Sequence, residues 1–150
     1  MLNLGRLGFL KNSDKHRKLN RISFKIPSEI KYIKKTSSRI LKDLSSFADE
    51  STLFDIRLCV EEAVRNAIVH GNHCDKKLSV KIAYWVEGAK LVIDIEDEGK
   101  GFDYKSLPDP TDTEHIMRNS GRGVYLIHHL MDEVDYNDKG NRVSMIRYLS

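Results

Sequence analysis

Short stretches of the chain alternate apolar and polar residues, which is the pattern of strands with one buried face. Residues 21–26 place Ile22, Phe24 and Ile26 between polar neighbours, and Pro27 ends this stretch. The same two-residue period predicts strands over 79–86, 90–97, 134–136 and 142–149. The turns "EGAK" and "NDKGN" join these strands in pairs, so two hairpins are expected.

Three other stretches have apolar residues at helical spacing. The first follows Ser28, a residue type that commonly caps helices, and extends to Phe47. A polar loop at 45–52 precedes a second helix, expected over about 53–70, and a third is expected over 124–134. This order of elements predicts one α+β domain: a two-layer sandwich with a mixed, mainly antiparallel sheet and helices packed on one face.

The basic residues of the chain are concentrated at its start. Residues 1–21 hold six Lys or Arg and one acid, a net +5, and since the whole chain has formal net charge +3, residues 22–150 carry −2. We therefore expect a basic, flexible tail over 1–20 and a folded domain over 21–150 that does not bind nucleic acid directly. No apolar run approaches the roughly 20 residues of a membrane span, and no secretory signal is recognisable.

The two cysteines, Cys59 and Cys74, are not spaced as a CxxC motif. Together with the missing export signal, this favours reduced thiols and a cytoplasmic protein. The string "HGNHC" raises the alternative of a metal site formed by His70, His73 and Cys74. A second ligand cluster at zinc-site spacing is lacking, which makes a structural metal the weaker interpretation.

The helix expected over 53–70 carries more than a packing face. Its apolar arc consists of Leu53, Ile56, Val60, Ala63, Val64 and Ala67. Glu61 and Arg65 are spaced to form a solvated ion pair. Asp55, Glu62 and Asn66 form a separate stripe, and asparagine is a poor helix former. Glu62 and Asn66, one turn apart, offer hard oxygen ligands suited to Mg²⁺ and a water molecule.

Two glycine-containing loops add candidate ligand contacts. "DEGKGFD" (97–103) leaves a strand whose parity points Asp97 inward, where a carboxylate needs a specific donor such as the amino group of a purine. Gly99 and Gly101 allow the backbone to approach a ligand closely. "SGRG" (120–123) stands directly before a helix, where free N–H groups and Arg122 would attract phosphate. Each loop on its own is more typical of an ordinary turn than of a phosphate site.

These three strings occur in a characteristic order. "EEAVRNAIVHGN" (61–72), "DEGKGFD" and "SGRGVYLI" (120–127) resemble the N, G1 and G2 boxes of the GHKL or Bergerat-fold ATPase superfamily, also called histidine kinase-like ATPases. The resemblance covers about residues 20–149. Within the superfamily, the small size and the strings "EAVRNAIVHGN" and "GRGVYLIHHLMDEV" are most similar to bacterial anti-sigma factor/serine-protein kinases of partner-switching systems.

The resemblance implies ATP and Mg²⁺ as cofactors and gives each matching residue a role. Glu62 would be the general base, Asn66 would bind Mg²⁺, and Asp97 would accept from the adenine amino group. Further nucleotide contacts would come from Gly99, Gly101 and Phe102, and from Ser120, Gly121, Arg122, Gly123 and Val124 at the end of a lid (102–120). Asn141 replaces the threonine that the superfamily usually has after its last glycine, and His70 would be a polar contact at the helix end.

The resemblance also implies a function. The chain would be a protein serine/threonine kinase that phosphorylates an anti-sigma-factor antagonist and sequesters a sigma factor, as a homodimer in the cytoplasm. Two alternatives stay open: a nucleotide-dependent binding module without transferase activity, and a detached catalytic domain of a histidine kinase.

Overall fold

The computed structural model describes residues 17–101 and 122–150, without the Arg122 side chain. Residues 1–16 of the expected tail, Phe102, Ser120 and Gly121 lie outside the described residues. The described elements are β1 (Lys18–Pro27), the 3₁₀ turn η1 (Ile30–Tyr32), α2 (Ile33–Leu44), α3 (Glu50–Asn66), the π-helical turn η2 (Ala67–Gly71), β2 (Ser79–Glu87), β3 (Lys90–Glu96), α5 (Arg122–Leu130), β4 (Glu133–Tyr136) and β5 (Arg142–Tyr148).

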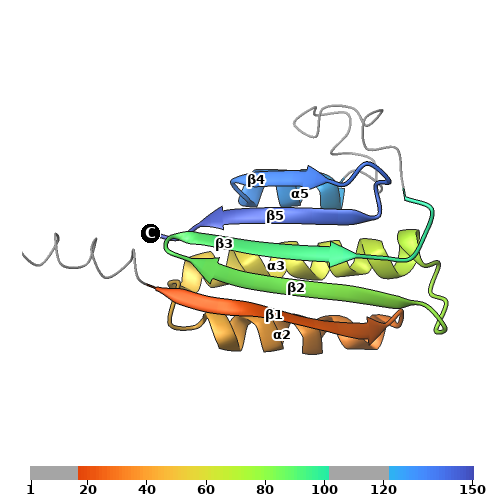
Figure 1. Ribbon diagram of the computed structural model, residues 1–150, viewed down its shortest axis with the longest axis horizontal. Helices are drawn as coiled ribbons and strands as arrows, with labels where there is room; N and C mark the ends of the chain where they lie inside the picture. Colours follow the sequence, from red (N-terminus) through yellow and green to blue (C-terminus); the bar gives the residue numbers. More distant parts are fainter. Residues whose placement is uncertain (1–16, 102–121) are drawn as a thin grey trace, which may run out of the picture.

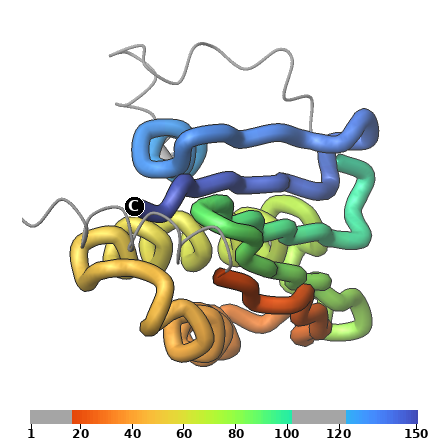
Figure 2. Tube along the Cα trace, turned by 60° about the vertical axis from the view of Figure 1, so that its left-hand side comes forward, coloured from red at the N-terminus to blue at the C-terminus, as the bar shows by residue number. Residues whose placement is uncertain are grey.

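The described strands form one sheet of five, in the order β1-β2-β3-β5-β4, and every neighbouring pair is antiparallel. α2, α3 and α5 cover one face of this sheet, as the two views agree (Figures 1 and 2). The expected two-layer α+β sandwich is confirmed. The described sheet is antiparallel throughout and not mixed.

The core fills the space between the sheet and the helices. Along β2, Val80, Ile82, Tyr84 and Val86 are buried at alternate positions, and Leu91, Ile93 and Ile95 continue the same face on β3. α3 contributes the arc expected from its sequence, including Ile56, Val60, Ala63 and Val64. None of the described helices has the length and apolar character needed to cross a membrane.

Ser28 does not cap a helix, so this prediction is wrong. The residue before η1 is Glu29, and neither η1 nor α2 has a side-chain cap. Ser28 is instead fully buried, and its hydroxyl donates a hydrogen bond to the carbonyl oxygen of Leu78 at 2.7 Å. A polar side chain that is taken out of water needs such partners, and here they lie about fifty residues away in sequence.

Several element ends also differ from the predictions. β1 begins at Lys18, three residues before the expected start, because Leu19 already pairs with Val86 of β2. α3 begins at Glu50, inside the expected loop, where the Asp49 carboxylate caps it by accepting from the N–H of Thr52 at 2.8 Å. α5 ends at Leu130, and the residues from Glu133 onward form strand β4.

Glu61 and Arg65 do not form the expected ion pair in the described part of the chain. Glu61 Oε1 accepts a hydrogen bond from the Ser37 hydroxyl at 2.9 Å, which ties α3 to α2. The ion pair on this helix is formed by Asp55, whose carboxylate lies 3.4 Å from Arg147 of β5. The prediction used only the spacing along one helix, whereas the actual partners lie on neighbouring elements.

Candidate functional site

The two polar residues of α3, Glu62 and Asn66, lie in its last turns. Asn66 is the final residue of the α-helix, and from Ala67 the chain continues as the π-helical turn η2. Asn72 N–H bonds to the Ala67 carbonyl at 2.8 Å, a separation of five residues. Single π turns are frequent at functional sites because they shift side chains relative to a regular helix. Asn66 thus lies at a change of helix type.

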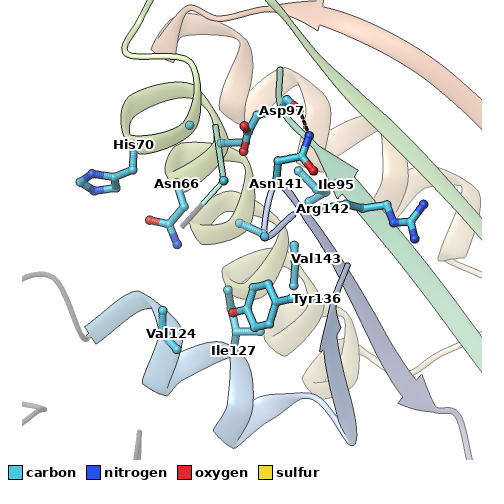
Figure 3. Close-up of a pocket in the computed structure, with 15 residues that line it drawn as sticks. Asn66, His70, Ile95, Asp97, Val124, Ile127, Tyr136, Asn141, Arg142 and Val143 are labelled. Carbon is cyan, nitrogen blue, oxygen red and sulfur yellow. Dashed lines mark hydrogen bonds between the residues drawn. The ribbon is translucent and has the colours of Figure 1, made fainter. Parts of the chain in front are cut away.

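A cavity of about 310 Å³ opens beside this junction. Figure 3 shows Asn66 from α3, Asp97 from the end of β3 and Asn141 from the start of β5 around it, with Val124 and Ile127 of α5 on another side. Its lining also includes Ala63, Ala67, His70, Gly71, Ile95, Gly101, Tyr136, Gly140, Arg142 and Val143. Three stretches far apart in sequence therefore meet at one mainly apolar cavity, whose volume is that of a small-ligand site.

Asp97 follows β3 directly and is the acidic residue that lines this cavity. Its Oδ1 accepts a hydrogen bond from Gly99 N–H at 2.8 Å, while Oδ2 has no hydrogen-bond partner among the described residues. Burial raises the pKa of Asp97, and the Gly99 N–H partly offsets this rise. The half-buried carboxylate can accept a further hydrogen bond from a ligand donor in the cavity.

Glycines surround Asp97 because side chains do not fit there. A Cβ at Gly71 would lie 2.2 Å from Asp97 Cγ, and one at Gly99 would lie 2.1 Å from the carbonyl oxygen of Gly71. Gly101 has φ +82°, and a Cβ there would lie 1.7 Å from the carbonyl oxygen of Lys139. The sequence interpretation assigned Gly99 and Gly101 to this wall but missed Gly71, whose only signal is the glycine at the end of "EEAVRNAIVHG".

The first turn of α5 faces Glu62 and Asn66. A Cβ at Gly123 would lie 2.6 Å from Glu62 Oε2 and 3.5 Å from Asn66 Nδ2. Gly123 is therefore next to the polar end of α3, and Val124 lines the cavity. Ser120, Gly121 and the side chain of Arg122 lie outside the described residues, so their predicted phosphate contacts stay predictions.

Asn141 lines the cavity and also holds Asp97 in place. Its Nδ2 donates to the Asp97 carbonyl oxygen at 2.7 Å, and the Asp97 N–H donates to the Asn141 carbonyl oxygen at 2.9 Å. Its Oδ1 accepts from Asn137 Nδ2 at 2.8 Å. Both ends of the amide thus have protein partners. Asparagine at this position links the turn before β5 to the end of β3.

The histidines near the cavity do not form a metal site among the residues that the structure describes, which contain no group of three or more His, Cys, Asp or Glu side chains placed to hold an ion. Figure 3 shows the His70 imidazole directed away from Asp97. Both thiols are free: Cys74 is exposed, and Cys59 is buried, which raises its pKa to about 12.

The donor and acceptor set of the cavity fits an adenine nucleotide with a hard divalent cation. Asp97 offers an acceptor oxygen on the glycine-lined side, and Ile95, Ile127 and Val143 offer apolar surface. At the other side Asn66 lines the cavity and Glu62 lies one turn earlier on α3, and both carry oxygen atoms of the kind that Mg²⁺ prefers. An adenine nucleotide has a flat base with an amino group at one end and charged phosphates at the other, which matches this polarity.

The arrangement of sheet, helices and cavity is that of a nucleotide-binding ATPase class, and the sequence comparison agrees. The profile of the histidine kinase-like ATPase domain family matches residues 26–147. The chain belongs to this family.

Curated relatives narrow the similarity further. Serine-protein kinase RsbW of Bacillus subtilis (strain 168) is 32% identical over 139 residues, which cover 86% of this chain and 86% of the relative. Serine-protein kinase RsbW of Staphylococcus epidermidis is 30% identical over 139 residues, with 85% and 86% covered. The protein of the same name from Staphylococcus aureus (strain Newman) is 31% identical over a stretch of the same length.

Proposed function

We propose that this chain is an ATP-dependent serine-protein kinase that phosphorylates a small anti-sigma-factor antagonist and sequesters a sigma factor in a partner switch. The observation that carries the proposal is that Asn66 and Asp97 line one cavity, while Glu62 lies one turn before Asn66 on α3, against Gly123. Relatives that align over most of both chains are named serine-protein kinase, which supports the reaction.

Each described polar residue has a distinct part in this mechanism. Asp97 accepts a hydrogen bond from the adenine amino group, and Gly71 and Gly99 leave room for its carboxylate. Asn66 would provide an oxygen to hold Mg²⁺, and the ion would supply positive charge that offsets the charge of the phosphates. Glu62 takes the proton from the incoming serine hydroxyl. Gly123 allows the first turn of α5 to approach Glu62 closely.

The partners and setting belong to the same proposal. The antagonist presents the serine, and the sigma factor competes for the same protein, with the bound nucleotide selecting between them. We propose a homodimer that acts in the cytoplasm without binding nucleic acid itself. The two free thiols agree with a reducing compartment.

Transfer of labelled phosphate from Mg-ATP tests the reaction. The purified chain is incubated with the antagonist encoded beside it, and wild type is compared with Asn66→Ala and Glu62→Gln. We expect phosphorylation of a serine by wild type and a loss of roughly 100-fold or more in Glu62→Gln, since general base catalysis typically contributes 10²–10⁴-fold. Arg57→Gln, a change on a solvent-exposed part of α3, is the matched control.

The outcomes separate the proposal from its two rivals. A wild type that binds ATP and the partner but never transfers phosphate supports a binding module without transferase activity. A product that loses its label in acid is phosphohistidine and supports a detached histidine-kinase domain, whereas phosphoserine survives acid. Equal labelling by wild type and Asn66→Ala overturns the role of Asn66 at the metal.

A further inference from the structure

Asn72 is a buried polar residue that neither the sequence interpretation nor the proposed mechanism uses. It follows the π turn directly and is 1% exposed. A buried amide is costly unless its donors and acceptor are satisfied, so its partners indicate what it holds. It does not line the cavity itself.

The side chain of Asn72 joins three separate segments. Its Nδ2 donates to Ser28 Oγ at 2.8 Å and to the carbonyl oxygen of Ser79 at 3.0 Å. Its Oδ1 accepts from the backbone N–H of Glu98 at 2.8 Å. These partners are the residue after β1, the first residue of β2 and the loop after β3.

Glu98 closes this set of contacts into a ring. Its Oε2 accepts from the N–H of Ser79 at 2.6 Å, so Asn72, Ser79 and Glu98 are each bonded to the other two. Glu98 is the neighbour of Asp97, and the next residue, Gly99, donates to the Asp97 carboxylate. The ring therefore fixes the residues that follow Asp97, in addition to the hydrogen bonds that Asn141 makes to Asp97 itself.

There is little space around Asp97, so the positions of its neighbouring segments matter. The carboxylate lies where a Cβ on Gly71 would be, and Asn72 is the next residue after Gly71. One side chain thus determines both where the end of η2 lies and where the loop 97–99 lies. A shift of either would move Asp97 Oδ2 relative to the cavity.

We propose that Asn72 is a positioning residue that sets the nucleobase specificity of the cavity, by holding the Asp97 carboxylate where only a base with an amino group satisfies it. This inference rests on the proposed nucleotide-binding function. Asn72 acts through the ring and touches no substrate. Ser28 supports it as one of the two acceptors of its amide.

Calorimetry with ATP and inosine triphosphate (ITP), which has an oxygen in place of the amino group, tests the inference. Wild type is expected to prefer ATP strongly. In Asn72→Ala the affinity for ATP falls and that for ITP changes little, so the ATP-to-ITP ratio drops by about tenfold, the effect of one hydrogen bond to a charged group. Ser28→Ala, which leaves the bond to Ser79, gives a smaller drop in the same direction.

Tyr84→Phe is the control for general destabilisation. It removes the 2.6 Å hydrogen bond from the Tyr84 hydroxyl to Asp43, in a fully buried position that does not line the cavity. Its ATP-to-ITP ratio is expected to equal that of wild type. An unchanged ratio in both Asn72→Ala and Ser28→Ala overturns the inference, as does an equal drop in Tyr84→Phe.

Amide hydrogen exchange in the nucleotide-free protein gives a second readout. We expect the N–H groups of Glu98 and Gly99 to exchange faster in Asn72→Ala, and to be unaffected in Tyr84→Phe. Unchanged exchange at both amides of Asn72→Ala overturns the inference even where affinity falls. A wild type that binds neither nucleotide contradicts the proposed function itself, which is a different result from an unchanged ratio.

Discussion

The two sides of the cavity are held in different ways. On the sheet side, Asp97 is fixed by hydrogen bonds to Asn141 and Gly99, and its loop by the ring around Asn72. On the helix side, the described hydrogen bonds that tie α5 to β5 lie after the helix or at its C-terminal end. There the Asp132 N–H donates to the Ile146 carbonyl at 2.8 Å, and Arg147 donates to the Leu130 carbonyl.

Among the described residues, the contacts at the start of α5 are packing contacts instead. Ile127 is buried in the core, and Gly123 lies against the end of the Glu62 side chain. A hydrogen-bonded loop has one geometry, whereas a helix end that rests on a flexible side chain can adjust. Under the proposed function, the side that receives the base is therefore preorganised, and the side that receives the phosphates can adjust to its ligand.

The largest effect is expected from Asp97→Asn on the sheet side. The substitution removes the charge and can turn a donor toward the adenine amino group. ATP affinity should fall by about 10- to 150-fold, the equivalent of the roughly 1.5–3 kcal/mol of a hydrogen bond to a charged group. Calorimetry measures this, with Asp135→Asn, an exposed residue of β4, as the control. Wild-type affinity in Asp97→Asn would falsify the role of the carboxylate.

Gly71→Ala is expected to have the next largest effect. The new Cβ would lie 2.2 Å from Asp97 Cγ, so the carboxylate and its loop must move. We expect a loss of about 1–3 kcal/mol in the free energy of unfolding, typical of overpacking, together with weaker ATP binding. Urea unfolding and calorimetry measure the two changes. Normal stability combined with normal affinity would show that the sheet side is not rigid.

Gly123→Ala makes the matching change on the helix side. Here the Cβ meets Glu62 Oε2, the end of a flexible side chain, which can move aside. The unfolding free energy should stay within about 0.5 kcal/mol of wild type, but kcat should fall by about tenfold because the carboxylate is displaced. ATP affinity should change little. If Gly123→Ala destabilises the protein as much as Gly71→Ala, the contrast between the two sides is wrong.

The smallest effect concerns pH. Burial raises the pKa of Asp97 above its ordinary 3.8, so the folded chain binds this proton at a higher pH than the unfolded chain does. The stabilising contribution of the protonated carboxyl is complete below the unfolded pKa and is lost as pH rises through the folded pKa. Asp97→Asn should therefore be more stable than wild type at pH 7 and lose this advantage on acidification. Urea midpoints across pH 3–7 check this, and a constant difference would contradict it.

The sequence predicted the parts of the site that depend on local pattern. Glu62 and Asn66 share a helix, and Asp97 shares the parity of β3, so spacing alone placed them correctly on their elements. The fold class was predicted in the same way, because stretches with a two-residue period and stretches with helical spacing follow one another in the order expected for an α+β sandwich. The three sequence boxes then indicated that these elements converge.

The roles that were missed depend on contacts between distant segments. Ser28 was expected to be a helix cap, yet its partners are Leu78 and Asn72, which no local pattern identifies. Gly71 is a site residue only because Asp97 occupies the space of its missing Cβ. The third helix was predicted too long because Val134 fits both a helical pattern and a strand, and pairing with Met145 of β5 decides for the strand.

The π turn at 67–71 has a consequence for how this chain can change during evolution. Its extra residue sets the angular offset between Asn66, upstream, and Gly71 and Asn72, downstream. Loss of one residue there would restore a regular helix and leave Glu62 and Asn66 in phase. It would also rotate the "HGN" segment out of register with β2 and the loop after β3. Under the proposed function, such a deletion would separate the residues assigned to phosphate from those assigned to the base, so we expect the length of this turn to matter as well as its residues.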